Sequence, residues 1–230
     1  MKEMLSNSVF FGVMISVLAY EFGVFLKKKT KLAVCNPLLI SIILVMIVLA
    51  VFRIDYDTYK QGADLLSYLL TPATVCLAIP LYEQLSLLKK NMKAVMAGIV
   101  SGVLTSLTTI LVLAVIFGLS HEEYVTLLPK SITTAIGMGV SEELGGIVTI
   151  TVAVIIVTGI LGNVIGEYVC RLFKIEEPIA KGVALGSASH AIGTARAMEM
   201  GEIEGAMSSL SIAVAGLLTV VGASVFAQIL

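Results

Sequence analysis

The stretch "AVMAGIVSGVLTSLTTILVLAVIFGL", residues 94–119, contains no charged side chain and decides the class of fold. A helix needs about 20 apolar residues to cross the hydrocarbon core of a bilayer, so this stretch is long enough to span it. The whole chain of 230 residues has a similar character, with 58% hydrophobic and 13% charged residues. Because soluble domains are about one quarter charged, the composition predicts an all-α polytopic membrane protein.

Further spans are predicted on both sides of this stretch, and some of them are interrupted by Pro, Gly, Ser and Thr. Irregular backbone at membrane depth is tolerated only inside protein or beside a cavity, so such interruptions predict broken or re-entrant helices. About six to eight membrane segments result, since each needs about 20 residues. Continuous spans are expected at about Ser6–Leu26, Asn36–Phe52, Ile147–Cys170 and Ala206–Leu230, and interrupted segments at 70–80, 128–146 and 182–205.

Three clusters of basic residues, at 27–31, 89–93 and 171–181, orient the chain. The positive-inside rule places them in the cytoplasm, so the N-terminus is expected outside the cytoplasmic (inner) membrane. The first span is expected to be retained, because no small-residue cleavage site follows it. The polar stretch "RIDYDTYKQGAD", residues 53–64, is then a connector on the outer face.

The interrupted segments occur in both parts of the chain, which is typical of transporters built from inverted repeats. We therefore expect one membrane domain over residues 1–230, with repeat halves at 1–119 and 120–230. In such folds the binding site lies near the bilayer midplane, where the broken helices meet.

The polar stretch "GSASHAIGTARAMEMGE", residues 186–202, lies between hydrophobic segments and contains Arg196. A charge in the bilayer interior costs at least about 2–3 kcal/mol, so it normally marks a partner, a pathway or a bound anion. The planar guanidinium of Arg196 suits a carboxylate ligand. An ion pair with Glu199, three residues further along a helix, or with Glu202 is an equal alternative.

His190 and Thr194 belong to the same stretch and share one face of a helix, because they are four residues apart. A histidine can donate to a carboxylate or carry its proton, although a buried histidine bonded to a carbonyl is an equally good interpretation. Ser189 and Gly193 offer a hydroxyl and a backbone amide, and the N-terminal end of a half-helix attracts anions. Small residues also simply permit close packing of helices.

Further candidate residues lie in the other interrupted segments. In residues 127–146, Lys130, Ser131, Thr133 and Thr134 follow a proline in a pattern typical of a helix start. Lys130 could attract an anion, or it could lie at the membrane interface. Thr71 and Thr74 could form an opposing half-site, although a kinked span would also explain them. Candidates for coupling to a proton or sodium ion, with a solvated loop as the alternative, are Glu142, Glu143 and Glu199.

Several classes of function are disfavoured. The net charge of −1 provides no basic face for nucleic acid, and the cysteines Cys35, Cys76 and Cys170 lie too far apart for metal-ligand spacing. The sequence has no GxSxG, HExxH, P-loop or CxxC motif, so we expect neither an enzyme nor a bound cofactor or metal.

Three stretches carry a specific resemblance that covers most of the chain, leaving only the first two spans generic. They are "LLTPATVCLAIPLYEQ" (69–84), "LLPKSITTAIGMGVSEELGGI" (127–147) and "IAKGVALGSASHAIGTARAMEMGEIEGAMSSLSIAVAGLLT" (179–219). These stretches resemble the LrgB/CidB family of bacterial membrane proteins. The resemblance implies a core of crossing broken helices, like that of cation:proton antiporters and anion transporters.

The resemblance also implies two functions. Members of the family were described as holin/antiholin-like modulators of murein hydrolase export and cell lysis, encoded beside a small LrgA/CidA subunit. Related bacterial proteins transport pyruvate, and a plastid relative moves glycolate and glycerate. We expect secondary transport of small monocarboxylates by alternating access, with the holin/antiholin-like oligomeric modulator as the alternative. Expected partners are an LrgA/CidA-like subunit, a small carboxylate solute, the lipid bilayer and further copies of the chain.

Overall fold

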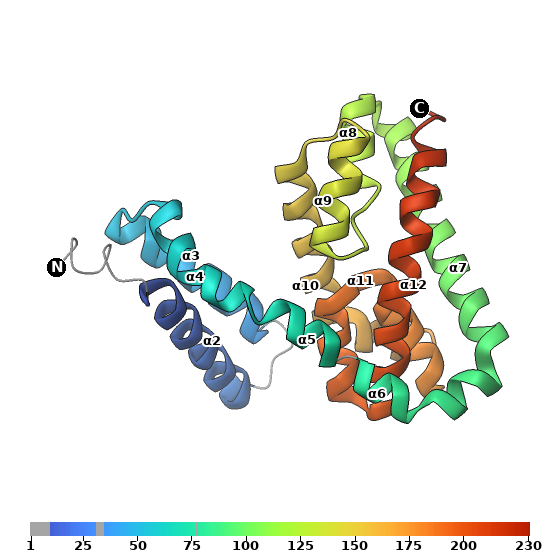
Figure 1. Ribbon diagram of the computed structural model, residues 1–230, viewed down its shortest axis with the longest axis horizontal. Helices are drawn as coiled ribbons and strands as arrows, with labels where there is room; N and C mark the ends of the chain where they lie inside the picture. Colours follow the sequence, from blue (N-terminus) through green and yellow to red (C-terminus); the bar gives the residue numbers. More distant parts are fainter. Residues whose placement is uncertain (1–9, 31–34, 77) are drawn as a thin grey trace. The chain divides into compact units, whose positions relative to one another are not determined.

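A computed structural model describes residues 10–30, 35–76 and 78–230 of the chain (Figure 1). Within these ranges every regular element is an α-helix, so the expected all-α class is confirmed. The chain divides into two compact units, Met1–Cys76 and Leu77–Leu230. The division into repeat halves after residue 119 stays a prediction.

The first unit contains α2 (Phe11–Thr30), α3 (Pro37–Phe52), α4 (Tyr56–Ser67) and α5 (Leu70–Cys76). The almost entirely apolar α3 begins where the Asn36 side-chain oxygen accepts hydrogen bonds from the Leu38 and Leu39 amides, at 2.8 and 3.3 Å. A hydrogen bond of 2.8 Å between the Ser16 and Tyr59 hydroxyls joins α2 to α4.

The polar connector expected over residues 53–64 is not a loop, because most of this stretch forms α4, and its place on the outer face stays a prediction. Its charged residues, such as Asp57 and Lys60, are exposed, while Gly62 is buried. The buried face of α4 packs against α2, and this tertiary contact stabilises a helix whose charges alone suggest a loop.

The second unit begins with the short α6 (Ala78–Glu83) and the long α7 (Leu85–Phe117). The helix α7 starts well before the expected Ala94, because the basic stretch 89–93 is also helical. The remaining elements are α8 (His121–Leu127), α9 (Thr134–Glu143), α10 (Val148–Leu172), α11 (Pro178–Met200) and α12 (Glu202–Phe226).

In the described part of the chain, α7, α10 and α12 are long and apolar enough to cross a membrane, and α3 is a shorter apolar helix. These helices support the membrane class predicted from the composition. The count of six to eight membrane segments stays a prediction.

The interrupted segment expected at 128–146 contains one short helix, α9, and residues 128–133 join it to α8, which lies before the segment. The helix α8 begins with a capping box, in which Ser120 and Glu123 exchange hydrogen bonds of 2.8 and 3.3 Å. The bond from the Ser120 amide lowers the pKa of the Glu123 carboxyl. At 1.5 Å per residue, α8 and α9 each cover at most about half of a bilayer, so neither crosses it alone.

The hydrophobic core of the second unit is formed mainly by α7, α8 and α12, and α11 packs against α7, α10 and α12 (Figure 1). One close backbone approach is to α12, at Gly186. A Cβ atom added there would lie 2.8 Å from the Ser208 Cα atom and closer still to the Ser208 carbonyl oxygen. Glycine is therefore required at this crossing, because any side chain would force the two helices apart.

Candidate functional site

The backbone of α11 is interrupted at Ser189 and His190. Ser189 has φ of −135° and ψ of 17°, and His190 has φ of 43° and ψ of −140°. A non-glycine residue held in such a conformation costs about 1–3 kcal/mol, so the surrounding structure must stabilise it. The break divides α11 into an N-terminal half, 178–188, and a C-terminal half, 191–200. The expected broken helix is thus confirmed, and the break lies within the polar stretch 186–202.

The His190 side chain connects this break to α10 by a hydrogen bond. Its Nε2 atom lies 3.0 Å from the Ile155 carbonyl oxygen. Since a carbonyl oxygen can only accept, Nε2 carries the hydrogen and donates it. His190 is only 3% exposed, so it is a buried histidine with an internal partner.

Thr194 connects the same break to α12. Its hydroxyl donates to the His190 carbonyl oxygen at 2.9 Å. Having used its one hydrogen, the Thr194 oxygen accepts from the Ser208 hydroxyl, at 2.7 Å. Both side chains are buried. The hydroxyl of Thr194 is therefore occupied by bonds within the helix bundle.

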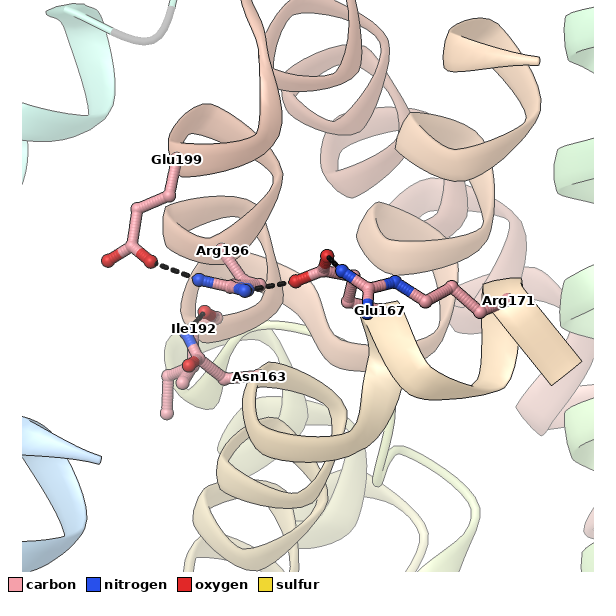
Figure 2. Close-up of polar contacts among 6 residues, drawn as sticks. All are labelled: Asn163, Glu167, Arg171, Ile192, Arg196 and Glu199. Atoms are coloured by element: carbon pink, nitrogen blue, oxygen red, sulfur yellow. Dashed lines mark hydrogen bonds and ion pairs between the residues drawn. The ribbon is translucent and has the colours of Figure 1, made fainter. Parts of the chain in front are cut away.

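Arg196 lies between two carboxylates, as Figure 2 shows. Its Nη1 atom donates to Glu199 at 2.5 Å, and its Nη2 atom donates to Glu167 of α10. Glu167 also accepts from Arg171, one turn further along α10. Beside this network the Asn163 side chain donates to the Ile192 carbonyl oxygen at 2.7 Å. The C-terminal half of α11 is thus joined to α10 at two points.

These ionic side chains line a cavity of about 450 Å³. Because its basic and acidic residues balance, the cavity offers a single carboxylate little net attraction. Within the described residues, no group of three His, Cys, Asp or Glu side chains could hold a metal ion. The basic lining residues are Arg171, Lys174, Lys181 and Arg196, and the acidic ones are Glu167, Glu176, Glu199 and Glu204.

A larger cavity, of about 740 Å³, lies between α7, the N-terminal half of α11 and the link before α9. In its lining the Lys130 ammonium donates to the Ser131 hydroxyl at 2.9 Å, and the Ser131 and Ser106 hydroxyls lie 3.3 Å apart. No carboxylate forms an ion pair with Lys130 among the described residues. This cavity therefore holds a cation whose charge is not neutralised by an ion pair.

The predicted site residues fall in three places rather than one. Ser189, His190, Gly193 and Thr194 lie at the break, Arg196 and Glu199 line the smaller cavity, and Lys130 and Ser131 line the larger one. Thr133 precedes α9 and Thr134 begins it, while Glu142 and Glu143 are exposed at its end. Thr71 and Thr74 lie in α5, with side chains outside the described part of the structure. Ligand binding by these residues stays a prediction.

Two sets of polar residues were missed from the sequence. Glu167 could have been found as an acidic residue inside an apolar span, but its partner Arg196 is 29 positions away. The other set lies on α7 within the span expected at 94–119, where hydroxyl residues recur about once per helical turn. These residues line the larger cavity and are Ser101, Thr105, Ser106 and Thr109.

Comparison with known proteins gives a consistent result over almost the whole chain. A sequence model of the LrgB-like family matches residues 16–229. The antiholin-like protein LrgB of Bacillus subtilis (strain 168) is 37% identical over 224 residues, which cover 97% of each chain. The antiholin-like protein LrgB of Bacillus mycoides (strain KBAB4) is 37% identical over 92% of this chain and 93% of its own. No solved structure matches this chain. From this coverage, the chain belongs to the LrgB-like family.

Proposed function

We propose that this chain acts as an antiholin-like membrane protein, an oligomeric modulator of murein hydrolase export and cell lysis. The name of its relatives, which are similar over nearly their full length, supports this class. The proposal places the chain in the cytoplasmic membrane as a multi-pass protein with its N-terminus outside, beside a small LrgA/CidA-like subunit. The basic clusters near the span ends support this orientation.

The observation that carries the proposal is that the polar residues of 186–202 bond to one another and to neighbouring helices. His190 bonds to α10, Thr194 to α12, and Arg196 to α10. In the described part of the chain, no buried side-chain nitrogen or oxygen lacks a hydrogen-bond partner. Polar groups paired in this way hold helices together in a membrane. This supports a packed body that acts by association, rather than a solute site at His190 and Arg196.

Production of the chain in a bacterial host without its own LrgB-like protein is expected to lower the release of murein hydrolase activity and to slow lysis. Zymography of the culture supernatant and the decline in optical density after detergent addition measure the two effects. Gly139→Ala, at an exposed position with no atom within 4 Å of an added Cβ, controls for protein amount in the membrane. Unchanged lysis at an equal membrane level of the wild-type chain would contradict the proposal.

Transport of small monocarboxylates is a second candidate, favoured by the larger cavity. A carboxylate needs a cation and hydrogen-bond donors that bind weakly enough for release, and Lys130 with Ser131 offers such groups. Proteoliposomes containing the chain, with and without an LrgA/CidA-like subunit, are expected to take up labelled pyruvate or glycolate with saturation. A leak that does not saturate would instead favour an oligomeric pore.

A further inference from the structure

The larger cavity extends along one face of α7, which we call the α7 lane. The lane consists of the α7 residues that line this cavity between Asn91 and Thr109, which occur singly or in adjacent pairs once per helical turn. At 1.5 Å per residue the lane is about 27 Å long. This length is close to the thickness of the hydrocarbon core of a bilayer, about 30 Å. The lane is therefore a mostly apolar surface of membrane-spanning length, and its hydroxyl side chains lie between Ser101 and Thr109.

The N-terminal half of α11 forms a second wall beside the first part of the lane. A Cβ atom on Gly98 would lie 3.1 Å from the Val183 Cγ1 atom, and one on Gly102 would lie 3.1 Å from the Ser187 hydroxyl oxygen. The two helices therefore run side by side in the same direction. This wall stops where α11 breaks, directly after Ala188.

Lys130 and Ser131 line the same cavity opposite the lane, beyond the point where the N-terminal half of α11 ends. Ser131 bonds to Ser106, which lies one turn beyond Gly102 on α7. The other charged residue in the lining is Glu177, just before α11, at about the level of Asn91 by the same register. Fifteen residues of α7 separate these two levels, which amounts to about 22 Å. The Lys130 ammonium therefore dominates the electrostatic potential at the Ser106 end of the lane.

We infer that Lys130 is a charge-selecting residue in the α7 lane, where it binds a small monovalent anion and excludes cations of similar size. The Ser131 and Ser106 hydroxyls supply further polar contacts beside the ammonium. A fixed charge in a cleft with low-dielectric walls raises the local concentration of counter-ions. A transport role for this site rests on the second candidate function above, whereas the charge selection itself does not.

A cysteine reporter in the lane tests this inference on the full-length chain in lipid nanodiscs. The three native cysteines are replaced, and Thr105→Cys is introduced, with Ser101→Cys as a second reporter. Each reporter protein is treated with an anionic reagent, sulfonatoethyl methanethiosulfonate, or a cationic one, trimethylammonioethyl methanethiosulfonate. The reaction rate of the reporter cysteine with each reagent is divided by the rate of a small free thiol with the same reagent. On this scale the anionic reagent is expected to react at least about tenfold faster than the cationic one at Thr105→Cys.

Three variants isolate the charge of Lys130. Lys130→Met is expected to remove the preference for the anionic reagent, and Lys130→Arg is expected to keep it. Lys181→Met removes a lysine that lines the smaller cavity, and it should leave the preference unchanged. Leu104→Cys lies on the exposed apolar face of α7, where charged reagents in lipid should not react.

Two results would overturn the inference. A helix from a partner chain would also fit the largely apolar lane, beside the N-terminal half of α11 that already packs against Gly98 and Gly102. If such a helix covers the lane, neither reagent reaches Thr105→Cys or Ser101→Cys. If the ratio of the anionic to the cationic reaction rate is the same with Lys130 and with Lys130→Met, the charge selection is rejected. Uptake that survives Lys130→Met would retain transport and show that it does not depend on Lys130, whereas selective labelling without uptake would retain the charge selection and reject transport.

Discussion

Replacing Gly186 with alanine is expected to separate α11 from α12 and to produce the largest loss of stability among the changes considered. The added Cβ atom would lie 2.8 Å from the Ser208 Cα atom and from the Ser211 Cβ atom. Because the nearest obstacle is backbone, no side-chain rotation relieves the clash. Overpacking of this kind costs about 1–3 kcal/mol or more. The shift should also lengthen the buried Thr194–Ser208 hydrogen bond.

Circular dichroism at the helix band, recorded during heating of detergent-solubilised protein, measures this effect, since the chain has no tryptophan for fluorescence. In a domain of this size, 1 kcal/mol corresponds to about 2–4 °C in melting temperature. Gly139→Ala is the matched control, because Gly139 is helical and exposed, with no atom within 4 Å of an added Cβ. That control should be neutral or stabilising by up to about 1 kcal/mol. Equal melting temperatures for the two variants would contradict the close packing of α11 on α12.

Replacing Arg196 with methionine is expected to have the second largest effect, a loss of about 1–3 kcal/mol. The Arg196 and Glu167 side chains are 26% and 28% exposed, so removing one leaves the other with incomplete solvation. Glu167 would keep only Arg171, whose side chain is 76% exposed. An ion pair that exposed contributes at most about 1 kcal/mol, so it cannot replace the lost partner.

A double-mutant cycle separates this pair from other effects. Arg196→Met combined with Glu167→Gln should recover part of the lost melting temperature, because the partly buried carboxylate at position 167 is then no longer present. Arg171→Met is the matched control and should change stability by less than about 1 kcal/mol. If Arg196→Met and Arg171→Met destabilise equally, the bridge between α10 and α11 has no special role.

The membrane class and the approximate positions of the long helices are properties of local composition, so the sequence was sufficient for them. An uncharged stretch such as residues 94–119 has few alternatives to a membrane helix, whatever surrounds it. The same reasoning failed for α4. Its exposed charges suggested a loop, while its contact with α2, which decides the helix, lies outside the local sequence.

In the candidate site too, local contacts could be predicted from the sequence and contacts between helices could not. The pairing of Arg196 with Glu199 could be predicted, because three positions along a helix bring the side chains together. The pairing with Glu167 could not, because it depends on how α10 packs against α11. Likewise, the serines and glycines of 186–202 predicted a break. Its exact position at His190 depends on the Ile155 carbonyl, which stabilises a backbone conformation that the chain alone disfavours.

The sequence by itself thus determined that this protein is a helical membrane protein with an interrupted helix in its polar stretch. Only the tertiary structure decided that the predicted polar residues separate into three groups, and that Lys130 lies with the hydroxyls of α7. The physical reason is the separation along the sequence over which each interaction acts. Hydrophobicity and helix periodicity act over neighbouring residues, whereas Ser106 and Ser131, or Glu167 and Arg196, meet only after whole helices have packed.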